Sequence, residues 1–279
     1  MKTRSLALVV LALATLASAL PAAAQRGPMP DRGYNYSNRF GEPPQQRRNA
    51  AGQFDYFALV MSWSPTHCAS SDRGSDELQC NRRDGKRYAF VLHGLWPQHE
   101  RGYPEYCPIA GRPFVPQPVI DSVLDIMPSP RLAIHEYKKH GTCSGLSPKE
   151  YYDLSRQMFK SIKVPDRYHN PMESQFVSPD ELADEFVNLN PNLKHDMVAV
   201  SCGGPGNRLR EIRVCFDKTG KPRSCGRNED QRKLCSANRM FVPPVRSSMR
   251  DDAQAKPQQE RDLRAPLPGP RVIPSPRAD

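Results

Sequence analysis

The chain has 279 residues, eight cysteines and a formal net charge of +10. After the apolar run that ends at Leu20, no segment is apolar and long enough to cross a bilayer, which excludes an integral membrane protein. The positive charge favours encounters with polyanions such as RNA, DNA or anionic cell surfaces, although it also serves plain solubility.

The N-terminus has the layout of a secretory signal peptide. The basic start MKTR precedes an apolar run from Leu6 to Leu20, and the small residues at 22–24 offer a cleavage site. We therefore assign residues 1–24 to a signal peptide. No cysteine near this site is available for a lipid anchor, so we expect a secreted or periplasmic protein that is not anchored to a membrane.

A single folded domain is predicted for residues 53–242. It is preceded by a polar segment, 25–52, without hydrophobic periodicity, which we interpret as a flexible leader. It is followed by a segment rich in proline and arginine, 243–279, which is predicted to be disordered because it has too few large apolar residues to offset the cost of chain ordering.

Strands and helices are both indicated within this domain, and they do not alternate strictly. Segments rich in aromatic and branched residues predict strands at 54–63, 88–92, 197–201 and 209–216, the last followed by a turn at 217–222. Ser-Pro-x-Glu capping boxes predict helices after Ser147 and Ser178. A third helix is expected to begin after Ser129 and to end at Gly141. The domain is thus predicted to be α+β.

The segment HEYKKHGTC, residues 135–143, concentrates side chains that carry chemistry. On a helix, residues three and four positions apart share a face, so Glu136, Lys139 and His140 should project together, with His135 beside Lys139. A solvated charged surface is the plainer interpretation of such residues. A zinc-protease site is also conceivable, but the two histidines are five positions apart rather than four, which on a regular helix turns them away from a common face.

A second segment, HGLWPQ at 93–98, follows the strand predicted to end at Leu92. It supplies a second imidazole, His93, and a tryptophan, Trp96. RNA carries its own nucleophile, the 2′-hydroxyl, so its cleavage requires a base, an acid and positive charge for the phosphorane. Imidazole titrates at about 6.5 in model peptides, and two imidazoles can therefore share the proton transfers without a metal.

These two segments, in this order, resemble the active-site segments of the ribonuclease T2 family. The resemblance extends from Phe54 to Met240 and includes SWSPTHC and EIRVCFD. It implies a single domain with a central antiparallel sheet flanked by helices. It also implies endonucleolytic cleavage of single-stranded RNA by a monomeric enzyme without a cofactor. Attack by the 2′-hydroxyl would leave 2′,3′-cyclic phosphate ends, and DNA, which lacks this group, would not be cleaved.

The resemblance also implies roles for individual residues. His140 would be the base and His93 the acid, while Glu136 and Lys139 would stabilise the transition state. His135 would bind phosphate. Base-binding residues would be Trp96, by stacking, with Gln98 and Tyr103; Tyr106 is an equal alternative to Tyr103. Where relatives have a Phe-Trp pair, a second Trp and an aspartate, this chain has Leu132, Ala133, Tyr137 and Gln98. These departures concern base preference more than activity.

The eight cysteines indicate four disulfides and an oxidising compartment, although their number alone leaves the pairing open. Zinc binding is the alternative, but no CxxC pair occurs. The family resemblance implies the pairs Cys68–Cys80, Cys107–Cys143, Cys202–Cys235 and Cys215–Cys225.

Two other functions remain to be weighed. A catalytically idle RNA-binding protein would not need both His93 and His140. A metal-dependent nuclease that cuts both DNA and RNA would need a cluster of acidic ligands, and none with suitable spacing accompanies the histidines. The sequence therefore predicts a metal-independent endoribonuclease.

Overall fold

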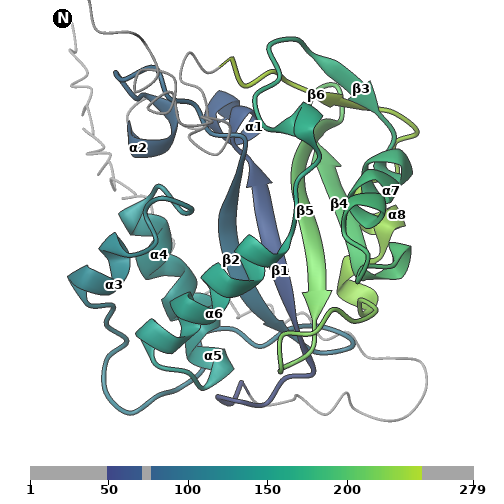
Figure 1. Ribbon diagram of the computed structural model, residues 1–279. Coiled ribbons are helices and arrows are strands. Elements are labelled where there is room, and N and C mark those ends of the chain that lie inside the picture. Colours follow the sequence, from purple (N-terminus) through teal and green to yellow (C-terminus); the bar gives the residue numbers. More distant parts are fainter. Residues whose placement is uncertain (1–48, 71–76, 247–279) are drawn as a thin grey trace, which may run out of the picture. The chain divides into compact units, whose positions relative to one another are not determined.

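The computed structural model describes residues 49–70 and 77–246 (Figure 1). The predicted signal peptide, residues 25–48 of the predicted leader and the tail from residue 247 lie outside the described residues. Residues on either side of the predicted 53–242 domain contact it, since Gly52 N–H donates to Cys143 O over 2.9 Å and Trp63 Nε1 donates to Pro243 O over 3.1 Å. In the part of the chain that the structure describes, no helix is long and apolar enough to span a membrane.

A six-stranded sheet forms the centre of this domain. Its strands run in the order β2-β1-β5-β6-β3, and β4 also pairs with β5. All pairs are antiparallel except β5 and β6, which are parallel where Arg208 meets Phe241. The strands are β1 (Tyr56–Trp63), β2 (Phe90–Gln98), β3 (Gln175–Val177), β4 (Val198–Gly203), β5 (Arg208–Phe216) and β6 (Met240–Val242).

Short and medium helices surround this sheet. In Figure 1, α3 to α6 lie on the side of β2, and α7 and α8 on the side of β4. The α-helices are α1 (Ser64–Ser70), α2 (Glu77–Cys80), α3 (Gln117–Asp121), α4 (Pro130–Glu136), α5 (Thr142–Ser144), α6 (Pro148–Ser161), α7 (Pro179–Leu189) and α8 (Gln231–Leu234). A π-helical turn, η1 (Tyr137–Gly141), joins α4 to α5, and 3₁₀ turns are η2 (Asp166–Tyr168), η3 (His195–Met197) and η4 (Arg227–Glu229). The predicted α+β fold is confirmed.

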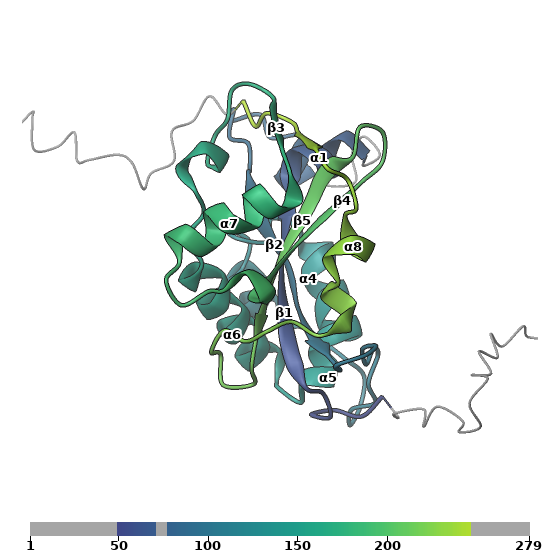
Figure 2. The ribbon, with the colours of Figure 1, turned by 90° about the vertical axis from the view of Figure 1, so that its right-hand side faces the viewer.

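The two faces of the sheet are used differently. Alternate residues of β1, such as Leu59 and Met61, pack into the main hydrophobic core with Tyr151 of α6 and Phe186 of α7. On the other face lies a small cluster around Tyr56, Ala58, Val60 and Cys215, against which Trp96 packs. Figure 2 shows the sheet nearly edge-on between α6 and α7 on one side and α4 and α8 on the other. The face with the small cluster therefore has room for a polar site.

The capping boxes were predicted correctly. Ser147 and Ser178 both accept a hydrogen bond from the backbone N–H three residues on, and Glu150 and Glu181 complete the two boxes. The predicted end of the third helix was wrong. The helix continues through Gly141 to Ser144 and ends at Gly145, which has the left-handed φ of 79°. Gly141 is small for another reason: a Cβ there would collide with the Tyr137 ring.

Four disulfides staple the domain. They join the pairs that the family resemblance implied: Cys68–Cys80, Cys107–Cys143, Cys202–Cys235 and Cys215–Cys225. The second bond ties the loop that contains Tyr103 and Tyr106 to the segment just after His140. Two of the bonds hold β4 and β5 to the segment around η4 and α8.

Candidate active site

His93 reaches the site from a bulge within β2. Val60 of β1 pairs with Gly94 and Met61 pairs with Leu92, so His93 is the extra residue between two paired positions. The bulge resets the alternation of side chains, and Leu92 and Leu95 therefore both lie in the main core. His93 and Trp96, also three residues apart, line the same cavity on the other face. The strand thus continues to Gln98, and the prediction that it ends at Leu92 was wrong.

The π-helical turn positions the second group of residues. In a π-helix hydrogen bonds span five residues, so residues five positions apart are brought closer together than on an α-helix. His135 and His140 line one cavity as a result. Our argument that a five-residue spacing turns them away from a common face was wrong, because it assumed a regular helix. No group of three or more His, Cys, Asp or Glu side chains suited to a metal occurs in residues 49–70 and 77–246.

All eight residues predicted to act on the substrate line one cavity of about 500 Å³. The π turn and the helix before it supply His135, Glu136, Lys139 and His140, and β2 and the loop after it supply His93, Trp96, Gln98 and Tyr103. Four further side chains complete the wall, and these are Arg213, Arg227, Asn228 and Lys233.

Glu136 lies between the two segments. Trp96 Nε1 donates to its Oε2 over 2.6 Å, and His93 Nε2 lies 3.7 Å from its Oε1. The backbone of β2 can approach so closely only because residue 94 is glycine, since a Cβ there would collide with the Glu136 carboxylate. Burial raises the pKa of Glu136 above its usual range, although the His93 charge and the Trp96 hydrogen bond oppose this shift.

His93 is held from its other side by Glu211 of β5. The Nδ1 atom of His93 lies 2.8 Å from Glu211 Oε1, and Arg213 Nη2 donates to Glu211 Oε2 over 3.0 Å. Burial alone would lower the pKa of His93, but the Glu211 hydrogen bond and the charges of Glu136 and Glu211 outweigh it and raise this pKa. His93 is therefore prepared to hold a proton.

His140 has the opposite environment. Its residue is 3% exposed, and its Nδ1 has no hydrogen-bond partner among the described residues. Burial, reinforced by the positive charge of Lys139, lowers its pKa to about 3. His140 is thus neutral over the range in which His93 gains a proton. The Lys139 ammonium lies 3.7 Å from Glu105 Oε2 at the edge of the same cavity.

The sequence model of the ribonuclease T2 family matches residues 54–225, which include every one of these residues except Arg227, Asn228 and Lys233. The chain belongs to the ribonuclease T2 family. It is an endoribonuclease, as the family resemblance predicted.

Similar ribonucleases occur in bacteria and plants. A ribonuclease of Aeromonas hydrophila is 35% identical over 205 residues, which cover 68% of this chain and 85% of the relative. Ribonuclease 1 of Arabidopsis thaliana is 26% identical over 193 residues, covering 62% and 80%. The solved structure of trichomaglin, an S-like ribonuclease, matches with a TM-score of 0.55 at 21% identity and covers 69% of this chain and 99% of its own. The last likeness shows the shared fold.

In this ribonuclease the predicted base-binding residues differ in accessibility. Tyr103 is 51% exposed and its ring lies 6.5 Å from that of His140. Gln98 is buried, and its Oε1 accepts a hydrogen bond from Asn228 over 2.9 Å. Trp96 is engaged by its neighbours, because it stacks on His140 at 5.0 Å and Arg213 lies 5.0 Å over its ring. The alternative residue, Tyr106, is exposed but does not line the cavity.

Sequence reasoning missed several side chains of this ribonuclease site. Glu211 and Arg213 are charged residues two positions apart on a central strand, so they share a face, and this pattern was the available signal. Arg213 also reaches Glu229, which accepts a hydrogen bond from the Tyr56 hydroxyl. Arg227, Asn228 and Lys233 gave no such signal, because they lie on a 3₁₀ turn and a four-residue helix.

Proposed function

We propose that this endoribonuclease cleaves single-stranded RNA by transphosphorylation, without a metal ion, and leaves 2′,3′-cyclic phosphate ends. The observation that carries the proposal is a single cavity that holds two imidazoles whose surroundings shift their pKa values in opposite directions. Both rings contact the same indole, His93 at 5.1 Å and His140 at 5.0 Å between ring centres.

The two imidazoles would divide the proton transfers. Neutral His140 takes the proton of the 2′-hydroxyl, and the resulting oxygen attacks the adjacent phosphorus. Protonated His93 gives its proton to the 5′-oxygen, which leaves as an alcohol when the P–O5′ bond breaks. One proton is taken and one is given, so the step balances without a cofactor.

The remaining residues of the helix would stabilise the charge of the phosphorane. Lys139 would supply positive charge at the cavity, and His135, which lines the same cavity, would bind the phosphate. With Glu136 protonated, as its raised pKa favours, its carboxyl would donate to a phosphoryl oxygen, and Glu211 alone would then balance the charge of His93. Glu211 would be a positioning residue, because its bond to Nδ1 leaves Nε2 of His93 to face the cavity.

Base recognition would involve Tyr103, with Gln98 held in place by Asn228. The exposure of Tyr103 supports stacking on a nucleobase. Trp96 was predicted to stack on a base as well, and this remains a prediction. Its contacts with His140, Arg213 and Glu136 support a positioning role instead.

The proposal also covers the choice of RNA over DNA and the location of the enzyme. DNA lacks the 2′-hydroxyl nucleophile, so we expect it to remain uncut. The signal-peptide layout and the four disulfides support secretion, and a similar tomato protein is named an extracellular ribonuclease. We propose that the mature enzyme is monomeric and carries no membrane anchor.

The test is cleavage of RNA and DNA by the purified, oxidised protein in excess chelator. We expect RNA cleavage to persist, the new ends to be 2′,3′-cyclic phosphates and DNA to remain intact. Chelator-sensitive cleavage of both nucleic acids would instead identify a metal-dependent nuclease. RNA binding without cleavage would identify an inactive RNA-binding protein.

A further inference from the structure

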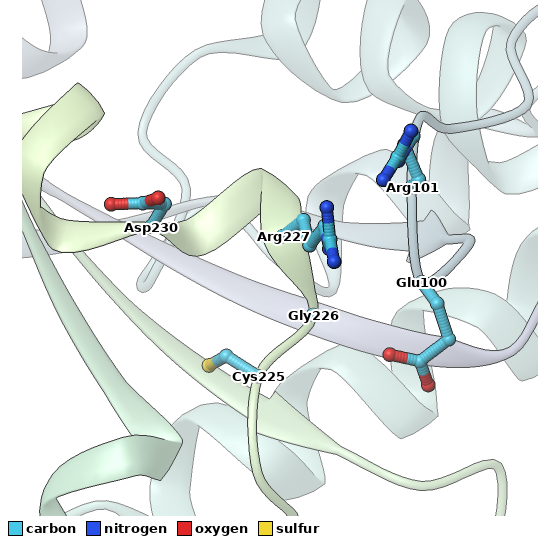
Figure 3. A pocket seen from close by; sticks show the side chains of 6 residues that line it. All are labelled: Glu100, Arg101, Cys225, Gly226, Arg227 and Asp230. Carbon is cyan, nitrogen blue, oxygen red and sulfur yellow. The ribbon is translucent and has the colours of Figure 1, made fainter. Parts of the chain in front are cut away.

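The catalytic cavity adjoins two other hollows through shared side chains. Arg227 also lines a hollow of about 500 Å³ formed with Glu100, Arg101, Cys225, Gly226 and Asp230 (Figure 3). We call it the Arg227 hollow. On the other side, His93 and Arg213 also line a hollow of about 360 Å³ between α1 and the strands β4 and β5. Arg210 contributes to its wall, and we call it the Arg210 hollow. Each of the two hollows therefore shares at least one side chain with the catalytic cavity.

The Arg227 hollow presents two guanidinium groups. In Figure 3, the side chain of Arg227 lies between those of Asp230 and Arg101, and Glu100 lies on the same side as Arg101. Its acidic groups are already engaged, because Glu100 pairs with Arg223 over 2.7 Å and Asp230 accepts the backbone N–H of Arg232 over 3.0 Å. No ion pair to Arg101 or Arg227 occurs within residues 49–70 and 77–246. With Glu100 paired to Arg223, the two guanidinium groups of this hollow suit an anion.

The Arg210 hollow combines a guanidinium group with hydroxyl groups. Arg210 lies flat against Gly203, where an added Cβ would be 3.2 Å from Nη1, so the glycine makes room for the guanidinium. The carboxylate of Glu211 is neutralised by His93 at 2.8 Å and Arg213 at 3.0 Å. Hydroxyl and guanidinium groups are the usual partners of phosphate and ribose. The hydroxyl side chains are Ser62, Thr66, Ser70 and Ser201.

We propose that RNA lies along these three spaces in a defined direction. The Arg227 hollow binds the phosphate on the 5′ side of the attacking nucleotide, and the Arg210 hollow binds the phosphate on the 3′ side of the leaving nucleotide. The direction rests on the proposed function: His93 protonates the leaving 5′-oxygen, so the leaving nucleotide lies beyond His93, toward Arg210. The attacking nucleotide lies beside His140 and Tyr103, on the side of Arg227.

Short substrates test both contacts and the direction. The starting substrate is whichever dinucleoside monophosphate the wild-type enzyme cleaves fastest, and it is compared with the same molecule carrying an added 5′-phosphate or an added 3′-phosphate. For wild type we expect each added phosphate to raise kcat/KM by roughly three- to tenfold, the gain expected for a charge-assisted contact at a partly exposed site.

The variants assign each gain to one hollow. Arg227→Ala should abolish the gain from the 5′-phosphate and keep the gain from the 3′-phosphate, and Arg210→Ala should do the reverse. Arg112→Ala is the matched control, because Arg112 is exposed and lines none of the three spaces, and it should keep both gains. On long single-stranded RNA, Arg227→Ala and Arg210→Ala should each reduce the slope of log kcat/KM against log salt by about 0.7.

The outcomes separate this proposal from the proposed function. If neither added phosphate raises kcat/KM of the wild type, or if both variants lose both gains equally, the two proposed phosphate contacts are wrong. The proposed cleavage reaction would be unaffected by that result. If the two gains are exchanged between the variants, the direction is wrong. If wild type forms no cyclic phosphate from any dinucleoside monophosphate, the proposed function itself fails.

Discussion

The bulge of β2 and the π turn after α4 each present one histidine to the same cavity, yet in opposite electrostatic settings. His93 is bonded to one carboxylate and faces another, and its side chain is 29% exposed. His140 is buried, next to Lys139, and has no carboxylate partner among the described residues. One pKa rises and the other falls. The surroundings, and not the residue type, shift the two pKa values apart, and this difference underlies the proposed division into acid and base.

The largest expected effect comes from removing each imidazole in turn. His93→Ala should lower kcat/KM on a dinucleoside monophosphate about 10³-fold, since the leaving oxygen then departs without a proton. The loss should be much smaller on a nucleoside 3′-(4-nitrophenyl phosphate), whose leaving group needs no proton. His140→Ala should lose equally on both substrates. Equal losses for the two variants on both substrates would contradict the division into acid and base.

The next effect concerns stability at acid pH. His140 has its pKa lowered to about 3, whereas an unfolded histidine titrates near about 6.5. The contribution of His140 to the free energy of unfolding is fully present above its pKa in the unfolded chain. It is lost as the pH falls, because only the unfolded chain then takes up the proton. His140→Phe should therefore reduce the loss of unfolding free energy between pH 7 and pH 4 by on the order of 2 kcal/mol, measured by urea titration.

His93 should change the pH dependence of the unfolding free energy in the opposite direction, as measured by the same urea titrations. Because its pKa is raised, its contribution is present below the unfolded pKa and disappears as the pH rises through the folded value. His93→Phe should therefore steepen the loss of stability toward acid pH. If both phenylalanine variants shift the pH dependence in the same direction, the contrast between the two environments is not real.

Glu211→Gln tests the environment of His93 alone, because the Glu211 carboxylate lies against His93 Nδ1. Loss of the negative charge lowers the pKa of His93, so the alkaline limb of the kcat profile should move to lower pH, with roughly a tenfold loss of kcat at pH 8 and little change in KM. Glu173→Gln, an exposed carboxyl remote from the cavity, is the control. A loss of activity with an unchanged profile would make Glu211 merely structural.

The smallest effect is expected at Tyr103, the proposed base-stacking residue. Tyr103→Ala should raise KM by roughly fivefold and leave kcat nearly unchanged, because a stacked base contributes to binding and not to proton transfer. Tyr106→Ala provides the matched control, since Tyr106 is equally exposed and does not line the cavity. A larger effect at Tyr106 would transfer the base contact to that residue.

The sequence predicted those parts that depend on local or periodic patterns. The capping boxes at Ser147 and Ser178 and the strands β1 and β5 have strong signals of this kind. The two motifs were sufficient to identify the family and to select eight residues that gather in one cavity.

The remaining features depend on single-residue irregularities and on distant partners. The bulge at His93 and the π turn each insert one residue into a regular ladder, which periodicity cannot detect. The pairing of His93 with Glu211 joins residues 118 positions apart, and only the sheet order β2-β1-β5 brings them together.

The disulfide between Cys107 and Cys143 makes the completed cavity depend on the redox state of the compartment. It links the helical segment just after His140 to the loop that contains Tyr103. The same loop makes a further hydrogen bond, in which Tyr106 N–H donates to Lys139 O over 2.8 Å. Such a crosslink does not persist where glutathione and thioredoxin keep thiols reduced. We expect a newly made chain in a reducing compartment to lack this disulfide, so that the proposed export would be needed to complete the cavity wall.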